Sequence, residues 1–509
     1  MSLSLAAVLA EPAWRNPGKT AVIQGDQQVT YAELWAQSLA QAAALQARGV
    51  EPGDRVALLS PNVVDFPRGY YAILAAGAIV VPVHLLLTPT EIAYILKDSG
   101  AKLLVAHVSR AEEAAKAAEL AGVPVLLVGA EPVDPAAPAL RTYVSRSPED
   151  PAVIIYTSGT TGEPKGAILT HLNLVMNATV SAYDCNATTT EDIALGCLPL
   201  FHIFGQTVSM NSVFRVGATL VMQPRFEADE AIDLMLRNHV NTFHGVPQMY
   251  LALVGAAKAR IAAGKPELPK LKIAISGGAS LPLAVLESFN EVFDTALMEG
   301  YGLSETSPTA TVNQLIFGAR AGTVGHPIWG VEVEVAQPDL EDRIELLAPG
   351  ELGELVIRGH GVFAGYLGRP EATAEAIVDG WFRSGDLGTK DETGYVTIVD
   401  RKKDLVIRGG YNVYPREVEE ALVRHPAIAD VAVIGLPDPV HGEEICACVI
   451  LKEGATATAE EIIAWSQERL AKYKYPRRIE FRTQFPLGPS MKVLKRELRA
   501  ELIAEQPSV

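Results

Sequence analysis

The segment from Tyr156 to Gly166, YTSGTTGEPKG, combines hydroxyls, glycines and one lysine directly after the apolar run AVIIYTS. Its hydroxyls can donate to phosphate oxygens and Lys165 adds a point charge, and its glycines let backbone N–H groups turn toward an anion. The segment therefore predicts a polyphosphate-binding loop at the end of a strand, although a polar surface turn has a similar composition. The residues concerned are Tyr156, Thr157, Ser158, Gly159, Thr160, Thr161, Gly162, Lys165 and Gly166.

This loop differs from the Walker A sequence, in which a Gly-Lys pair opens a helix. Here Pro164 precedes Lys165. The loop must therefore hold phosphate in another structural context.

A second polar string, EGYGLSET at 299 to 306, supplies turn glycines, the hydroxyl of Ser304 and the carboxylate of Glu305. Because a magnesium–nucleotide complex takes few protein carboxylates and several waters, one glutamate is sufficient. A helix start capped by Ser304 is the alternative. The string SGGA at 276 to 279 ends an apolar run and would let a flat ring approach the backbone closely.

Two histidines lie in apolar surroundings, His202 in PLFHIFG and His244 in FHGVP. Such histidines are often packed in a core, and this interpretation is kept for His244. Three later segments carry further polar residues: WFRSGDLG with Asp386, DRKKDLVIRGGYNVYPREVE with Arg401 and Lys403, and PLGPSMKVLKRELR with Lys492.

These segments, in this order and over essentially the whole chain, resemble the motifs of the acyl-adenylate-forming superfamily. It comprises acyl- and aryl-CoA synthetases, firefly luciferase and the adenylation domains of peptide synthetases. The string GGYNVYP favours the fatty-acyl-type CoA synthetases. The resemblance implies ATP and coenzyme A as co-substrates, and Mg²⁺.

The resemblance also implies a role for each segment. The first loop would hold the β and γ phosphates and Glu305 the metal, while His202 would position the substrate carboxylate and Lys492 would stabilise the transition state. Lys403 would be the hinge. Adenine would lie against Gly277, Gly278, Ala279, Glu299, Gly300, Tyr301, Gly302 and Ser304, ribose against Asp386 and Arg401, and pantetheine along Gly409 and Gly410.

The implied reaction has two steps, in which a carboxylate attacks the α-phosphate of ATP and CoA then displaces AMP. The sequence departs from the family at Met491, where glycine is usual, and a side chain there would restrict the backbone beside Lys492. A loader of carrier proteins and a non-catalytic acyl or nucleotide sensor are the alternative functions.

Other parts of the site are open to more than one interpretation. Apolar lining suits a fatty, branched or aryl acid equally, and the basic residues suit CoA phosphates or an ordinary surface. Lys495 and Arg496 are expected on a solvated face. The apolar candidates are Phe201, Ile203, Phe204 and Val208, with Gly277 and Gly278, and the basic ones are Arg408, Lys472, Lys474, Arg477 and Arg478.

Composition limits the class of protein. The chain has 509 residues, of which 49% are hydrophobic, so it can form several folded domains. Its net charge of −17 opposes nonspecific binding to nucleic acid or anionic lipid.

The N-terminus has neither a basic leader nor a membrane-spanning apolar run, which favours a cytoplasmic protein. Four cysteines are too few for a disulfide framework, and the alternation in EEICACVIL predicts a strand with Cys446 and Cys448 on one face.

The elements that must position these residues follow from alternation along the chain. Short β-branched runs such as DRVALLS and AKLLVAHV alternate with helical segments, which predicts an α/β fold with parallel sheets. Thr30 with Glu33 and Thr88 with Glu91 form capping-box patterns that predict two helix starts. We expect a large domain at 1–400, made of two α/β subdomains and a small β-barrel-like unit of short strands at about 320–399. A hinge at 401–403 and a small mobile α+β domain at 404–509 would follow. A homodimer is left open.

Overall fold

The computed structural model describes residues 3–130, 134, 137–157, 164–487 and 493–505. The chain divides into two compact units. The first unit comprises 1–333 with 357–382, and the second comprises 334–356 with 383–509. The predicted boundary at 401–403 falls inside the second unit and stays a prediction.

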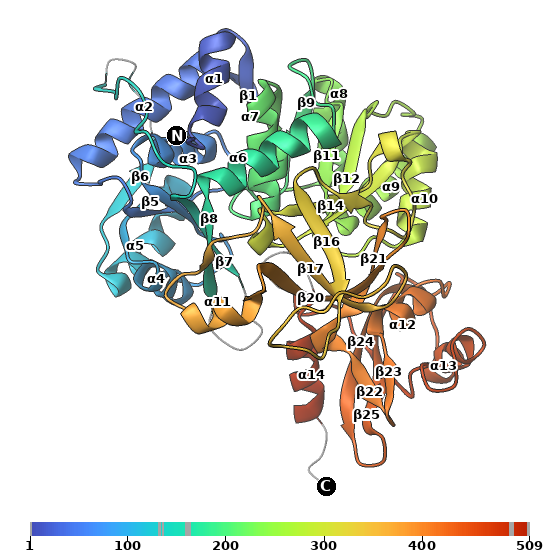
Figure 1. Ribbon diagram of the computed structural model, residues 1–509. Helices are drawn as coiled ribbons and strands as arrows, with labels where there is room; N and C mark the ends of the chain where they lie inside the picture. The colour runs from blue at the N-terminus through green and yellow to red at the C-terminus, as the bar shows by residue number, and fades with distance from the viewer. Residues whose placement is uncertain (1–2, 131–133, 135–136, 158–163, 488–492, 506–509) are drawn as a thin grey trace. The chain divides into compact units, whose positions relative to one another are not determined.

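The first unit contains a sheet with the strand order β18-β8-β7-β4-β3-β5-β6 (Figure 1). Its strands from β7 to β6 are parallel, as the alternation predicted, while β8 and β18 run antiparallel to their neighbours. The strands are β3 (Arg55–Leu59), β4 (Ile79–Pro82), β5 (Ala101–His107), β6 (Val125–Val128), β7 (Pro151–Thr157), β8 (Lys165–Thr170) and β18 (Gly365–Tyr366). The helices along this stretch are α3 (Asp65–Ala75), α4 (Pro89–Asp98), η1 (Val108–Arg110) and α5 (Ala111–Ala121).

A second sheet of the first unit has the order β15-β14-β13-β12-β11-β9-β10-β1-β2. Its strands are β1 (Thr20–Gln24), β2 (Gln27–Thr30), β9 (Ile193–Gly196), β10 (Thr219–Met222), β11 (Thr242–Gly245), β12 (Ile273–Ser276), β13 (Leu297–Gly302), β14 (Thr309–Val312) and β15 (His326–Pro327). The helices of this part are α1 (Ala7–Arg15), α2 (Tyr31–Ala47), α6 (His171–Val180), η2 (Ser181–Cys185), η3 (Gly205–Asn211), α7 (Ser212–Val216), α8 (Ala228–Arg237), α9 (Pro247–Ala262), α10 (Leu283–Phe293), η4 (Ser304–Thr306) and η5 (Leu315–Phe317).

Helix starts follow the local signals in the sequence. Thr30 accepts the N–H of Glu33 while the Glu33 carboxylate accepts the N–H of Thr30, and Thr88 with Glu91 repeats the pattern. Each pair satisfies backbone donors that a helix start would leave without partners. The predicted capping boxes at both positions are confirmed.

The short strands predicted for 320–399 form a further sheet, β16-β17-β20-β19, with β21 paired to β20. The division between the units passes through this sheet, because β16, β17 and β20 each contain residues of both units. The elements are β16 (Val331–Ala336), β17 (Gly353–Gly359), α11 (Pro370–Ala376), β19 (Ile377–Val378), β20 (Trp381–Lys390) and β21 (Val396–Arg401).

The second unit ends in a sheet of order β23-β22-β25-β24, with β26 parallel to β25. Cys446 and Cys448 alternate on β25, are buried and form no disulfide, and they pack with Leu498 and Leu502. The prediction that both cysteines lie on one face of a strand is thus confirmed. The elements are η6 (Lys402–Asp404), β22 (Val406–Arg408), β23 (Tyr411–Val413), α12 (Pro415–Leu422), β24 (Ile428–Asp438), β25 (Gly442–Leu451), α13 (Ala459–Gln467), β26 (Arg478–Phe481) and α14 (Lys495–Ala504).

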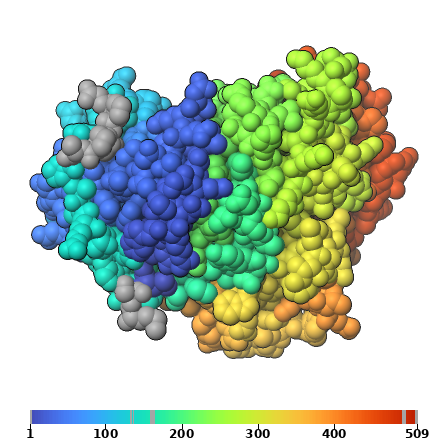
Figure 2. All heavy atoms as spheres, turned by 90° about the horizontal axis from the view of Figure 1, so that it is seen from above, coloured from blue at the N-terminus to red at the C-terminus, as the bar shows by residue number. Residues whose placement is uncertain are grey.

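Across the described ranges, every helix is too short or too polar to cross a bilayer. Within the first unit, α1 and α2 pack on each other. Helix α1 contacts α7, and the N-terminal residues, coloured blue, adjoin the green segment in Figure 2.

A buried histidine ties the N-terminus to this unit. His171 begins α6 and is 1% exposed, and its Nδ1 accepts the backbone N–H of Leu5 over 2.9 Å. Burial, together with the positive charge of Arg146, lowers the pKa of His171 to about 4. The folded chain therefore keeps this ring neutral at a pH where the unfolded chain protonates it.

We expect folding stability to fall as the pH drops from 6.5 toward 4, because the unfolded chain then binds the proton that folded His171 rejects. Between pH 7 and pH 5, protonation of this residue in the unfolded chain lowers the free energy of unfolding by about 2 kcal/mol. His171→Gln keeps an acceptor that does not titrate, so its melting temperature should fall less over this range. His239→Asn, at an exposed histidine, is the control. Equal pH dependence in His171→Gln and the parent chain would contradict the assignment.

Candidate functional site

The predicted phosphate loop connects two antiparallel neighbours, β7 and β8. Thr157 and Lys165 are paired across the ladder, so the two ends of the loop lie side by side. The Thr157 hydroxyl donates to the Lys165 carbonyl over 3.5 Å. Ser158, Gly159, Thr160, Thr161 and Gly162 lie outside the described residues, and their phosphate contacts stay a prediction.

The hydroxyl of Tyr156, which the sequence groups with the phosphate donors, has a carboxylate partner in this structure. Its hydroxyl donates to Asp98 Oδ2 over 2.7 Å, and burial with this carboxylate raises the pKa of Tyr156 well above its usual value. Successive side chains of a strand point to opposite faces, so Tyr156 and Thr157 diverge. Gly166 also serves packing, because a Cβ there would meet Ile154 at 2.8 Å.

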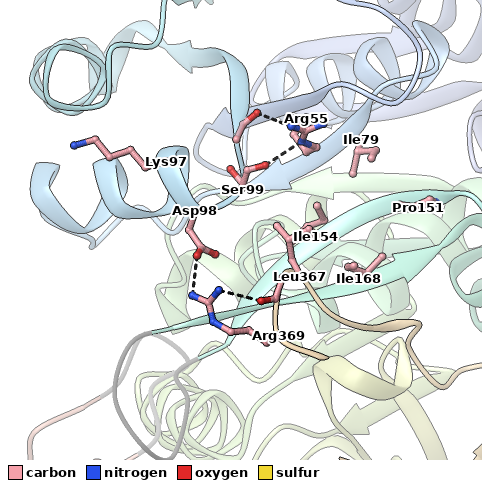
Figure 3. A pocket seen from close by; sticks show the side chains of 12 residues that line it. Arg55, Ile79, Lys97, Asp98, Ser99, Pro151, Ile154, Ile168, Leu367 and Arg369 are labelled. Carbon is pink, nitrogen blue, oxygen red and sulfur yellow. Dashed lines mark hydrogen bonds and ion pairs between the residues drawn. The ribbon is translucent and has the colours of Figure 1, made fainter. Parts of the chain in front are cut away.

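Asp98 belongs to a pocket of about 460 Å³ in the first unit (Figure 3). It also accepts from Arg369 Nη2 over 2.9 Å, while Arg55 donates to the carbonyls of Ser99 and Gly100. The charges of Asp98 and Arg369 thus compensate each other, and the drawn Lys97 side chain extends away from this group. The contacts bind the end of α4 to β7 and to the residues after β18.

Glu305 lies in η4 and is 8% exposed. The Tyr366 hydroxyl donates to its Oε1 over 2.8 Å, and the Phe363 N–H donates to its backbone carbonyl over 2.9 Å. In the described part of the chain, no cluster of three metal-ligating side chains occurs. A single oriented carboxylate nevertheless fits Mg²⁺ that arrives with a nucleotide, since phosphates and waters supply the other ligands.

Tyr366 brings the two predicted halves of this site together. Lys165 Nζ lies 5.4 Å from the centre of its ring, and its hydroxyl contacts Glu305. Burial and the Glu305 charge raise the pKa of Tyr366, so its hydroxyl stays protonated and donates. The sequence did not indicate Tyr366, because FAGYLG lies in a stretch of short strands and turns without a chemical motif.

The string at 299 to 306 forms the end of β13 and η4. Glu299 is buried and its Oε1 accepts the Leu281 N–H over 3.1 Å, so the carboxylate supports the backbone after SGGA. Gly302 is required sterically, because a Cβ would lie 1.7 Å from the Pro308 carbonyl oxygen. Gly300 and Tyr301 continue β13, and Ser304 begins η4.

The SGGA segment follows β12 and faces an aromatic ring. The Gly277 N–H donates to the Gly245 carbonyl over 3.1 Å, and Gly278 has φ +80°. The Phe204 ring lies against both glycines. A Cβ on Gly277 would meet this ring at 3.1 Å. Ala279 lies partly buried beside them. A small apolar cluster of Leu198, Phe204 and Val208 is thus continuous with the glycines.

The two histidines differ. His202 Nδ1 accepts the Phe204 N–H over 3.2 Å, which fixes its ring beside this cluster. His244 is 1% exposed, and burial lowers its pKa to about 4. The prediction of a core residue at His244 is confirmed.

The predicted ribose pair lies in the second unit. Asp386 on β20 and Arg401 on β21 are register partners, with Arg401 Nε 3.4 Å from Asp386 Oδ1. Lys403 follows in η6, where burial and the charge of Arg401 lower its pKa. Gly409 and Gly410, with φ of +57° and +82°, form the turn between β22 and β23, a conformation that favours glycine. Lys492 and Met491 lie outside the described residues.

Several basic residues proposed for CoA have acidic partners within the second unit. Arg408 pairs with Glu444, Lys474 with Glu417 and Arg478 with Glu480. The expectation of a solvated face is wrong for Lys495, whose Nζ lies 2.7 Å from Glu419 Oε1 in a largely buried position. The reason is that α14 packs on β24.

Known proteins match this chain over nearly its whole length. Residues 9–367 match the family described as AMP-binding enzyme, and residues 417–492 match the AMP-binding enzyme C-terminal domain. A long-chain-fatty-acid–CoA ligase of Bacillus subtilis (strain 168) is 35% identical over 98% of this chain and 94% of its own. A feruloyl-CoA synthase of an Amycolatopsis species is 37% identical over 95% of this chain and 96% of its own.

Solved structures of related enzymes are also similar to this chain over nearly its whole length. ATP-bound MatB from Rhodopseudomonas palustris is 33% identical, with a TM-score of 0.90 over 98% of this chain and 99% of that one. An anthranilate CoA ligase in complex with anthranoyl-AMP is 25% identical, with a TM-score of 0.90 over 99% of each chain. The chain therefore belongs to the AMP-binding enzyme family, as an ATP-dependent acid–CoA ligase that works through an acyl-adenylate.

Proposed function

We propose that the protein activates a medium- or long-chain fatty acid and transfers the acyl group to CoA. The observation that carries the proposal is the apolar cluster of Leu198, Phe204 and Val208 directly beside Gly277 and Gly278. Such a wall suits a hydrocarbon tail. The name of the 35% identical relative supports the same choice.

In the proposed first step, a carboxylate oxygen of the acid attacks the α-phosphorus of ATP. The bond to the bridging oxygen breaks, and pyrophosphate leaves with the electron pair. Lys165 and the hydroxyl loop hold the β and γ phosphates, His202 positions the acid, and Lys492 offsets charge at the α-phosphate. Glu305 would hold Mg²⁺, which neutralises phosphate charge when bound. The attacking carboxylate is already ionised, so no general base is needed.

In the proposed second step, the CoA sulfur attacks the acyl carbon, AMP leaves and the thiol proton passes to solvent. Asp386 would accept hydrogen bonds from the ribose hydroxyls, with Arg401 holding its carboxylate. A movement about Lys403 would exchange Lys492 for Gly409 and Gly410 between the steps. Because the reaction consumes ATP and CoA, we place the enzyme in the cytoplasm.

A second candidate substrate is an aryl acid. A flat ring stacks on Phe204 as readily as a chain packs on it. The 37% identical relative bears the name feruloyl-CoA synthase. The two candidates differ in how activity should depend on chain length.

Lys492→Ala should reduce acid-dependent pyrophosphate–ATP exchange by on the order of 100-fold or more, because the cation acts where charge develops. Conversion of synthetic acyl-AMP to acyl-CoA by this variant should persist, which shows that it is folded. Lys258→Ala, at an exposed helix position, controls for the loss of a charge. Unchanged exchange in Lys492→Ala would falsify the assigned role.

A panel of acids of graded length and ring content identifies the substrate class, with AMP release measured in the presence of CoA. For a fatty acid substrate, kcat/KM should rise about fourfold for each added methylene until the pocket is filled, since a buried CH₂ contributes about 0.8 kcal/mol. Greatest activity with ferulate or benzoate, and little length dependence, would instead establish the aryl candidate.

A further inference from the structure

We propose that Tyr366 is a positioning residue for adenylation, which holds the Glu305 carboxylate for the magnesium–nucleotide complex through its hydroxyl and guides Lys165 through its ring. The proposal rests on the functions proposed above for Glu305 and Lys165. Tyr366 itself has no proposed contact with substrate, so it would act through these two side chains.

The first argument is the way Glu305 is held. One segment contacts it twice, with the Phe363 N–H on its backbone carbonyl and the Tyr366 hydroxyl on Oε1. Glu305 is 8% exposed, so water cannot readily replace the hydroxyl. A hydrogen bond to one carboxylate oxygen fixes the plane of the group and thereby the directions of its other acceptor lone pairs.

The second argument is the way Tyr366 is held. It lies on β18, and the residues on either side of this strand pair with β8, since the Ala364 N–H donates to Ile168 O and the Leu367 N–H donates to Gly166 O. The Tyr366 N–H itself donates to Thr373 Oγ1. The Phe363 ring packs edge-on against its ring, with centroids 4.8 Å apart. The side chain is therefore fixed relative to β8, the strand that begins with Lys165.

The third argument is that two parts of the Tyr366 side chain contact different partners: the hydroxyl contacts Glu305 and the ring contacts Lys165. Lys165 Nζ lies 5.4 Å from the ring centre, within the range of a cation–π attraction. This attraction limits where the flexible lysine lies without using its N–H donors, which stay available to phosphate oxygens. Removal of the hydroxyl should thus affect metal-dependent binding, whereas removal of the ring should also affect metal-independent binding.

The experiment measures ATP binding to the full-length protein by titration calorimetry, with Mg²⁺ and with EDTA, and without acid so that no turnover occurs. Tyr366→Phe should weaken Mg–ATP binding about tenfold and change binding in EDTA less than twofold. Tyr366→Leu should weaken both. Tyr250→Phe, which loses another buried hydroxyl contact in the first unit, should leave both affinities unchanged even where its melting temperature falls.

Glu305→Gln separates this proposal from the one it rests on. If Glu305→Gln abolishes the effect of Mg²⁺ and Tyr366→Phe does not reduce it, Glu305 holds the metal but Tyr366 does not position it. If Glu305→Gln leaves the effect of Mg²⁺ intact, the role proposed for Glu305 fails. A Tyr366→Phe variant whose two affinities fall equally would show a merely structural residue and overturn the proposal.

Discussion

The candidate site of the first unit depends on the main-chain pairing of β18 with β8. These hydrogen bonds place residues that are distant along the chain beside the first residues after the phosphate loop. Main-chain pairing fixes both position and register. Tyr366 thereby reaches a cation at one strand end and a carboxylate in η4. A side chain on a free loop would lose more entropy in making the same two contacts.

The opposite side of the β7–β8 hairpin is fixed by a different interaction. Asp98, at the end of α4, accepts from Tyr156 on β7 and from Arg369 just after β18. One carboxylate thus ties together three elements that surround the ends of the phosphate loop.

The sequence predicted what local patterns encode. β-branched runs predicted the parallel strands, Thr30 with Glu33 predicted a helix start, and alternation put Cys446 and Cys448 on one face. It failed where a residue acts through a distant partner. β18 has two residues, too few for any periodicity, and nothing near Tyr156 indicates Asp98. Lys495 was misjudged because its partner, Glu419, lies on another helix.

An acidic protein that handles polyanions must compensate charge locally. With a net charge of −17 the chain has no general attraction for ATP or CoA, and Arg408, Lys474 and Arg478 already have carboxylate partners. A CoA phosphate that used them would have to compete with those carboxylates. Among the described residues, Lys165 lies against the ring of Tyr366 instead of a carboxylate, so an ATP phosphate would meet no such competitor there. Selectivity for the nucleotide would then arise from directed donors, and a strong surface field would be unnecessary.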